Sequence, residues 1–466
     1  MLHHRNDDRL PRRSDPRVDH REVDGALGKT LPGLRQSVGA FGDREWGDLM
    51  GNVDQLGLGA NSQDHAFHGG DIVIAQPEIG HQSDDWSFHL NWKKVQHFYF
   101  DHNATSPVAP EVLRDLSDAM AEVYGNASSI HHFGQAAKMR LEGARRLIAK
   151  RLGCTDREIV FTSGGTEADN LAVFGVAKRG HAITSAIEHP AVLNACAQLA
   201  DITVLPVGRE GVVDPYDVQR AICPETALIS IMHANNETGV MQPIAEIAEI
   251  ARENNVLFHS DGVQVGGRLP VNVRELGVDL YSISGHKFGA PKGIGALYIR
   301  KGVAVEALFY GGHHERDRRA GTENVPGAFA LGQAFSLIFD WSELRLLRDR
   351  LERGILSSVP DARVNGSVDR RMPNTSNIRF DGIEGEAMVI ALDLRGYAVS
   401  SGSACSSGAV EPSHVLLAMG LSPEEARSSV RFSLGPGNTE EQVDGLIEAV
   451  VAGAAHLRRI APAVHA

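Results

Sequence analysis

The sequence predicts an α/β fold with a mostly parallel sheet covered by helices on both faces. Seven short apolar runs of strand length alternate with helix-length periodic segments after about residue 98. This alternation is typical of parallel sheets, because a parallel connection must cross over and usually does so through a helix. The seven runs cover residues 159–161, 182–184, 203–207, 228–232, 256–258, 280–283 and 296–299.

The remaining segments complete the expected architecture. Helical periodicity marks residues 190–199 and 243–253, and a long helical region follows Thr322. From about residue 360 fewer strands mix with helices, which indicates a smaller α+β domain. We therefore expect a large domain over 98–358, whose first residues could join the small domain, and a small domain over 359–466.

Residues 1–97 differ from the rest of the chain. They hold three of the four tryptophans and several irregularly spaced histidines, with no clear helix or strand pattern. The histidine spacing fits no metal site, so we expect a poorly ordered extension. A start-site artefact, with translation beginning near Val95, is the alternative hypothesis. A native peptide from upstream of Val95 would exclude it.

Composition excludes several classes of function. A net charge of -13 argues against a nucleic-acid or membrane-surface binder. The sequence contains no run of 18 apolar residues, so it predicts no membrane-spanning helix. The N-terminus lacks the apolar region of a secretory signal. The four cysteines are scattered without a Cys-x-x-Cys pair, which disfavours a disulfide framework or a zinc site and fits the cytoplasm. Cys154, Cys196 and Cys223 have apolar neighbours and are expected to be structural.

Lys287 is the first candidate for chemistry. It follows the apolar run 280–283, precedes a glycine-rich turn and is flanked by Ser284 and His286, which could hold an anion. A lysine at the end of a buried strand is partly desolvated, which lowers its pKa and makes its amine a nucleophile toward carbonyls. Taken by itself, Lys287 could equally be an ordinary surface lysine in a turn. Other residues must therefore decide whether it is catalytic.

Two further strand ends carry polar groups. After the run 159–161, Gly165 and Thr166 open a helix whose free backbone N–H groups form an anion site, although simple helix capping would also explain them. Asp261 ends another strand, where a buried carboxylate is costly unless it meets a cation, although a helix-capping aspartate would also explain it, and Gln264 follows it. His189 follows a third strand and could stack on a ring and relay protons, or merely cap a helix.

From residue 100 to about 440, the sequence resembles the cysteine desulfurases, a branch of the class V aminotransferases among the fold-type I pyridoxal-phosphate enzymes. The resemblance lies in motifs that occur in family order. They cover residues 100–107, 124–129, 165–166, 232–239, 261–264, 284–287, 311–322, 400–405 and 428–433. This sequence differs from the family pattern at a few points. Ser106 replaces the usual threonine, Gly262 replaces the usual alanine, and residues 1–94 have no family counterpart.

The resemblance implies a role for each matching residue. Lys287 would bond to pyridoxal 5′-phosphate and later move protons, Asp261 would pair with the pyridine nitrogen and His189 would stack on the ring. Asn236 and Gln264 would hydrogen-bond the cofactor. Its phosphate would be held by Gly165, Thr166, Ser284, His286 and, from the neighbouring protomer of a homodimer, Thr322. Asn126 and Arg431 would hold the substrate carboxylate, for which the arginine fork is well suited.

Cys405 distinguishes desulfuration from transamination. It lies in the small, polar run 400–408, typical of an exposed loop, and its thiol needs activation because free thiols are mostly protonated at neutral pH. His189 or a base derived from the substrate could provide that activation. The implied product is a persulfide on Cys405, formed as L-cysteine becomes L-alanine. Its sulfur would pass to an iron–sulfur scaffold or a tRNA- or cofactor-thiolating acceptor.

Three alternatives remain open. Another class V aminotransferase would not need the Cys405 thiol. A selenocysteine lyase would carry its cysteine in a shorter loop with histidine, which 400–408 does not match. A non-catalytic scaffold would be expected to lack Lys287 or Cys405. No resident metal is expected, although Cys405 could transiently ligate a cluster in a complex with a scaffold.

Overall fold

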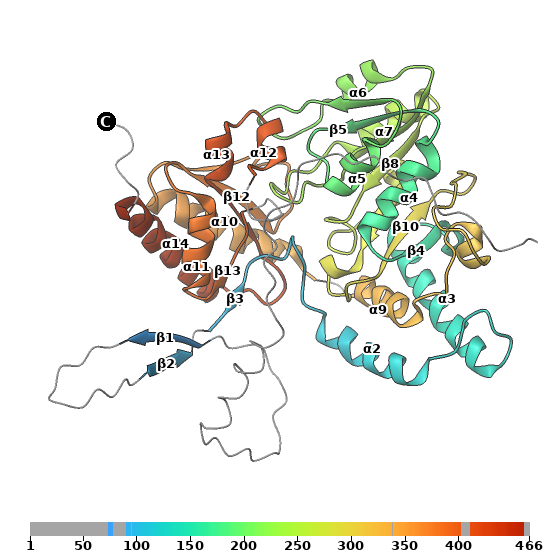
Figure 1. Ribbon diagram of the computed structural model, residues 1–466, viewed down its shortest axis with the longest axis horizontal. Coiled ribbons are helices and arrows are strands. Elements are labelled where there is room, and N and C mark those ends of the chain that lie inside the picture. The colour runs from blue at the N-terminus through green and yellow to red at the C-terminus, as the bar shows by residue number, and fades with distance from the viewer. Residues whose placement is uncertain (1–72, 78–89, 95, 338, 402–410, 461–466) are drawn as a thin grey trace, which may run out of the picture. The chain divides into compact units, whose positions relative to one another are not determined.

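The computed structural model describes residues 73–77, 90–94, 96–337, 339–401 and 411–460 (Figure 1). No helix in this described part is long and apolar enough to cross a membrane.

A seven-stranded sheet forms the centre of the large domain, and all seven predicted runs contribute a strand. Its strand order is β4-β10-β9-β8-β7-β5-β6. Every neighbouring pair is parallel except those of β10, which is antiparallel to β4 and β9. The strands are β4 (Ile159–Thr162), β5 (His181–Ser185), β6 (Ile202–Leu205), β7 (Thr226–Ser230), β8 (Leu257–Asp261), β9 (Leu280–Ser284) and β10 (Gly295–Ile299).

Helices cover both faces of this sheet. Successive residues of a strand point to opposite faces, and neighbours such as Ala182 and Ile183 accordingly belong to two separate apolar cores. The N-terminal part of the chain and the β–α connections supply the helices. They are α2 (Pro110–Glu122), α3 (His132–Leu152), α4 (Gly165–Ala177), α5 (Pro190–Cys196), α6 (Pro215–Ala221), α7 (Ile244–Glu253), α8 (Val273–Leu276) and α9 (Val325–Ser336).

The smaller α+β part has its own sheets and core. Strands β11 (Ala362–Val364), β12 (Thr375–Phe380) and β14 (Ser429–Ser433) form an antiparallel sheet, and β3 (Phe98–Tyr99) pairs in parallel with β13 (Tyr397–Ala398). Figure 1 shows its helices gathered around these strands. They are α10 (Trp341–Ser358), α11 (Gly385–Asp393), α12 (His414–Ala418), α13 (Pro423–Arg427) and α14 (Glu440–Ile460).

The second core extends beyond the predicted boundary. It includes Phe100, as expected for the first residues of the large domain, and also Trp341, Leu344, Leu351 and Ile355 of α10. The apolar face of α10 packs on the C-terminal sheet and helices. The change of core therefore falls before α10, one helix earlier than the boundary predicted at 358/359.

Among the described residues of the predicted N-terminal extension, two strands form one antiparallel pair. Strands β1 (Val73–Pro77) and β2 (Leu90–Lys94) pair antiparallel, whereas the sequence predicted no strand there. Each is only five residues long, too short to show a clear period. The other residues of 1–95 lie outside the described part, so their order and the start-site hypothesis stay predictions.

Candidate active site

Most predicted site residues line one cavity of about 170 Å³ at the carboxyl ends of the parallel strands. Ligand sites in sheets of this kind occur at that edge. The cavity contains both predicted catalytic residues among the described ones, Lys287 and His189. The other residues that line it are Gly165, Thr166, Asp169, Met232, Asn236, Asp261, Val263, Gln264, Ser284 and His286.

One end of the cavity is suited to an anion. Helix α4 begins after Gly164 without any side-chain cap, so its first N–H groups stay available. A Cβ atom on Gly165 would lie 2.8 Å from the Val263 side chain, which explains why glycine occupies this corner. No described residue hydrogen-bonds the hydroxyl groups of Thr166 and Ser284. The corner thus offers donors without partners.

The surrounding charges at this end are positive. The His286 ring nitrogen Nδ1 lies 3.1 Å from Thr105 Oγ1. Burial and, after it, the charges of Lys287, Lys292 and Arg268 together lower the pKa of His286 to about 4. His286 is therefore a neutral hydrogen-bonding group in a positive field.

Three buried carboxyl groups lie in the wall of the cavity or beside it. Burial raises the pKa of Asp261, of Asp169 and of Glu188, the last to about 8. Asp261 Oδ1 accepts a hydrogen bond from the Val263 N–H at 2.9 Å. Asp169 Oδ1 has no hydrogen-bond partner among the described residues and lies 3.7 Å from the His259 ring. Such a cluster favours a ligand that brings a proton or a positive charge.

His189 caps a helix and also lines the cavity. It is the N-cap residue of α5, and its Nδ1 accepts a hydrogen bond from the Ala191 N–H at 3.1 Å. Its ring also lines the cavity. Burial lowers the pKa of His189 although Asp261 opposes that shift. The capping bond fixes the tautomer, because an Nδ1 that accepts must be unprotonated.

Lys287 has the desolvated amine that its position predicted. It ends the short 3₁₀ turn Gly285–Lys287 after β9. The Nζ atom donates to the carbonyl oxygens of Asn103 at 2.7 Å and of Ala104 at 2.9 Å. Burial, followed by the charges of Arg268 and Arg431, lowers the pKa of Lys287 to about 7. A large fraction of this amine is therefore a neutral nucleophile near neutral pH.

Arg431 lies beside the cavity but does not line it. Its guanidinium donates to the carbonyl of Asn236 at 3.0 Å and to Asp101 Oδ1 at 2.6 Å. The buried Nε atom of Arg431 has no partner among the described residues. The arginine thus keeps its Nε–H donor, among others, for a further acceptor, and its ion pair with Asp101 was not predicted.

Two predicted site residues among the described ones, Asn126 and Thr322, are not brought to this cavity. Asn126 is exposed in the loop between α2 and α3, where its side chain accepts from the Ser128 N–H. Thr322 is exposed in the loop before α9. Cys405 lies outside the described residues. The roles of these three residues stay predictions.

Four residues around the cavity escaped the sequence reasoning. They are Asn103, Asp169, Glu188 and Arg268, each buried and in contact with, or lining, the cavity. Asp169 could have been recognised, because it lies one helical turn after the glycine corner, on the same face as Gly165 and Thr166. Asn103 and Arg268 gave no local signal, since their partners are distant in sequence.

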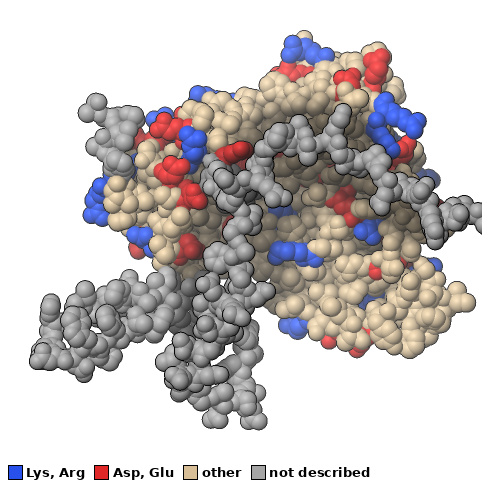
Figure 2. Space-filling view, in the orientation of Figure 1, with Lys and Arg blue, Asp and Glu red and all other residues tan. Residues whose placement is uncertain are grey.

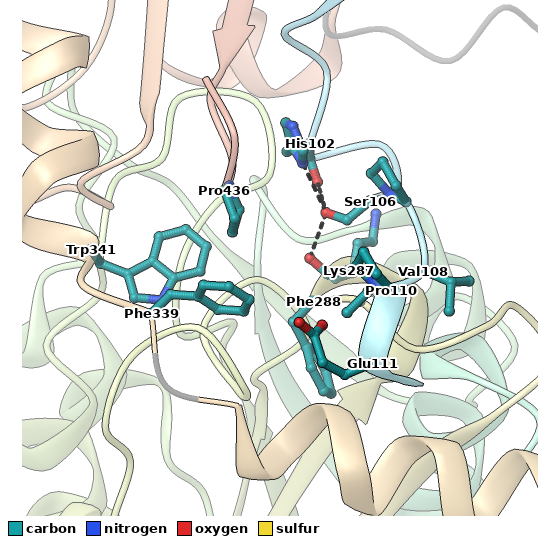
Figure 3. A pocket seen from close by; sticks show the side chains of 13 residues that line it. His102, Ser106, Val108, Pro110, Glu111, Lys287, Phe288, Phe339, Trp341 and Pro436 are labelled. Carbon is teal, nitrogen blue, oxygen red and sulfur yellow. Dashed lines mark hydrogen bonds between the residues drawn. The ribbon is translucent and has the colours of Figure 1, made fainter. Parts of the chain in front are cut away.

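A second cavity of about 230 Å³ is also lined by Lys287 (Figure 3). Its walls are mainly apolar and include Phe288, Phe339 and Trp341, with Glu111 at the first turn of α2. Ser106 lies above it and hydrogen-bonds the Lys287 carbonyl. This cavity offers few polar groups and no second set of candidate catalytic side chains.

Comparison with known proteins identifies the family. The family described as Aminotransferase class-V matches residues 98–446. The chain is 47% identical over 378 residues to cysteine desulfurase IscS of Dictyoglomus turgidum, covering 78% of this chain and 96% of that protein. It is 46% identical over 377 residues to a cysteine desulfurase of Trichormus azollae, covering 78% and 94%.

Solved structures agree. A NifS-like protein matches with a TM-score of 0.72 at 35% identity, covering 78% of this chain and 100% of that one. The structure titled SspA in complex with cysteine matches with a TM-score of 0.66 at 36% identity, covering 73% and 99%. The fold, the strand-end cavity and these matches show that the chain belongs to the class-V aminotransferase family.

Proposed function

We propose that the chain is a cysteine desulfurase that uses pyridoxal 5′-phosphate to convert L-cysteine into L-alanine and a persulfide on Cys405. The observation that carries this proposal is the polarised cavity around the Lys287 amine. Relatives that are named cysteine desulfurases align with most of this chain. Their names favour desulfuration of cysteine over the other reactions of the family.

The described residues fit this cofactor. A phosphate needs N–H and O–H donors in a positive field, and the corner at Gly165, Thr166 and Ser284 supplies them without competing partners. A protonated pyridine nitrogen needs a carboxylate, which Asp261 offers. Lys287 lines the same cavity, and its amine can bond to an aldehyde. When bound, the cofactor supplies an electron sink for the substrate's α-carbon.

The side chains of the chain have separate tasks in this proposal. His189 provides a flat ring against the cofactor, and Asn236 and Gln264 supply amide groups at the cavity wall. The neutral Lys287 amine takes and returns the substrate's α-proton. Arg431 clamps the substrate carboxylate through its unpaired Nε donor. In this step Asp101 keeps the guanidinium oriented.

Cys405 carries the sulfur step. Its thiolate attacks the sulfur of the substrate, so that the carbon–sulfur bond breaks as a sulfur–sulfur bond forms. Cys405 then bears a persulfide, and the three-carbon remainder takes up a proton and leaves as alanine. The persulfide sulfur would pass to an iron–sulfur scaffold or a tRNA- or cofactor-thiolating protein.

A homodimer is part of this proposal. Apolar side chains are unusually exposed around the α2–α3 loop: Ile130 is 93% exposed, Tyr124 71% and Phe133 50%. Figure 2 shows few charged residues over α2 and the start of α3, at the lower right. A groove joins Ala127 and Ser128 of this loop to the segment 313–316 that precedes Thr322. A second copy on this surface would bury the apolar groups and receive Thr322 and Asn126 at its site.

The test is the balance of products from L-cysteine and a reductant. The full chain loaded with pyridoxal phosphate should release alanine and sulfide in equal amounts. Cys405→Ala should abolish sulfide release but keep the visible absorbance of the lysine-bound cofactor, and Lys287→Ala should lose both. Cys223→Ala, which alters a partly exposed cysteine away from the cavity, is the matched control.

Each alternative function has its own outcome. An aminotransferase would transfer the amino group to a keto acid, and Cys405→Ala would leave that activity intact. A selenocysteine lyase would release selenide from selenocysteine and leave cysteine unreacted. A scaffold would bind no cofactor. Any of these results would refute the proposed desulfurase activity.

A further inference from the structure

A short segment of the N-terminal part of the chain wraps around Lys287. Residues 102–106, here called the strap, contact both the main chain and the amine of this lysine. The Ser106 N–H donates to the His286 carbonyl at 2.7 Å, and its hydroxyl donates to the Lys287 carbonyl at 3.0 Å (Figure 3). The carbonyl groups of Asn103 and Ala104 accept hydrogen bonds from the Lys287 amine.

Arg268 fastens the strap to Lys287 from the interior. Its Nε and Nη2 atoms donate to the Lys287 carbonyl at 3.0 and 2.8 Å. Nη2 also donates to the His102 carbonyl at 2.5 Å, and Nη1 donates to Asn103 Oδ1 at 2.9 Å and Gln264 Oε1 at 3.0 Å. A guanidinium has five N–H donors, so these five contacts can use them all.

The five contacts of Arg268 go to neutral oxygens. It is fully buried within the protein and pairs with no carboxylate among the described residues. A buried charge without a counter-ion is costly, and an apolar side chain would usually serve better as packing. The presence of an arginine here therefore implies that one or both of two properties are needed beside Lys287. One is its positive charge, and the other is the fixed planar arrangement of its N–H donors, here called the fork.

Asn103 links this fork to the rest of the molecule. Its side-chain amide donates to the Asn236 carbonyl at 3.2 Å and to Thr375 Oγ1 at 2.9 Å. Its main-chain N–H donates to Ser433 Oγ at 3.0 Å. The strap is thus hydrogen-bonded to the large domain through Asn236 and to the small domain through Thr375 and Ser433.

The hydrogen-bond count at the amine has a chemical meaning. A neutral amine has two N–H donors and one lone pair, and the two strap carbonyls satisfy both donors. The lone pair then remains free to take a proton. A lysine that alternates between bonding a cofactor and moving protons needs such a resting place each time its amine is released.

We propose that Arg268 is a positioning residue that fixes the strap and the Lys287 peptide, so that the released Lys287 amine docks on the carbonyls of Asn103 and Ala104 with its lone pair free. The catalytic consequence rests on the proposed desulfurase function, whereas the docking of the amine does not. Arg268 also contributes the largest charge effect among those that lower the pKa of Lys287, second only to burial.

The experiment separates the fork from the charge with two variants. Arg268→Met removes both, and Arg268→Lys keeps the charge but not the fork. Arg252→Met, which removes an exposed arginine on α7, is the matched control. Two quantities are measured on the full chain: the pH midpoint of Lys287 acylation in cofactor-free protein, read by mass spectrometry, and kcat and KM for L-cysteine in the loaded enzyme.

The expected results differ between the variants. In Arg268→Met the acylation midpoint rises from about 7 toward the ordinary lysine value, while burial still holds it below that value. In Arg268→Lys the midpoint stays near that of the unmodified chain. Both variants lose about 100-fold in kcat, the cost of misplacing a catalytic group by about 1 Å, with little change in KM. The control changes neither quantity.

Other outcomes would overturn the proposal. It fails if Arg268→Met keeps the midpoint and kcat of the control, or if a folded Arg268→Lys retains full kcat, because the fork would then be unnecessary. Should Arg268→Met not fold, by circular dichroism and gel filtration, Arg268→Lys alone decides. If the loaded unmodified chain has no desulfurase activity, the proposed function fails, whereas the acylation midpoints still test the charge effect of Arg268 on the Lys287 amine.

Discussion

Replacing Gly262 by alanine should destabilise this chain, although alanine is the common residue in the proteins it resembles. A Cβ atom on Gly262 would overlap the Tyr281 ring, closer than Cβ atoms come to other atoms in proteins. Tyr281 is fully buried, and its hydroxyl lies 2.8 Å from His233 Nδ1. The glycine therefore makes room for the tyrosine.

The expected magnitude follows from two costs. Forcing one methyl group into a packed core costs about 1–3 kcal/mol. If the tyrosine ring moves away, its hydrogen bond to His233 is lost, and a buried group without a partner costs about 1–3 kcal/mol more. We expect Gly262→Ala to lower the free energy of unfolding by about 2–6 kcal/mol. Cofactor affinity should also fall, because Asp261 and Val263 on either side line the cavity.

Urea unfolding of four chains tests this reasoning. The set is the unmodified chain, Gly262→Ala, Tyr281→Leu and the double variant. The double variant should be more stable than the sum of the single effects by about 1–3 kcal/mol, since the smaller side chain leaves space for the methyl group. Gly208→Ala, where an added Cβ meets no atom, should change stability by less than about 0.5 kcal/mol. Additive single effects, or a stable Gly262→Ala, would refute the packing argument.

Three further predictions concern buried charges and are each measured by urea unfolding. Lys287→Met should stabilise the cofactor-free chain most below pH 7, because a lowered lysine pKa penalises the charged form. This increase in the free energy of unfolding should disappear as the pH rises from 7 to 10.5. An increase that is independent of pH would contradict the prediction. Glu188, whose pKa is raised to about 8, holds its proton in the folded state, so its contribution to stability falls between pH 4.5 and 8. Glu188→Gln should flatten that slope and be more stable than the unmodified chain at pH 9; an unchanged slope would contradict this. Arg145→Met leaves Glu315 buried without its bidentate partner and should cost about 3–5 kcal/mol; a loss below about 1 kcal/mol would show that the pair is not buried as described.

The sequence predicted the parts of the site that depend on local pattern. Gly165, Asp261 and Lys287 each follow an apolar strand, and the carboxyl ends of such strands meet at one edge of a sheet. The seven strands and the α/β class followed from the same alternation. Short strands such as β1 and β2 show too little pattern to be predicted.

Contacts between distant segments could not be predicted in this way. Arg268 binds oxygens from three separate segments, and none of them carries a charge that would suggest a partner. The Tyr281 ring occupies the space that a side chain at position 262 would need. This packing relation exists only once β8 and β9 are paired in the sheet. Likewise, α10 has an amphipathic pattern that does not reveal which of two cores it will cover. Folding, and not local pattern, determines these relations.

The reversed direction of β10 affects the dynamics of the site. This strand lies between β9, which leads to Lys287, and β4, which leads to the glycine corner, and it is hydrogen-bonded to both. The ten-residue connection 285–294 is too short for a crossover, so it returns directly as β10. The lysine and the anion corner therefore belong to one three-stranded hydrogen-bonded unit. A thermal fluctuation that displaces one of them must carry the other along or break a ladder, which preserves their spacing while the surrounding loops move.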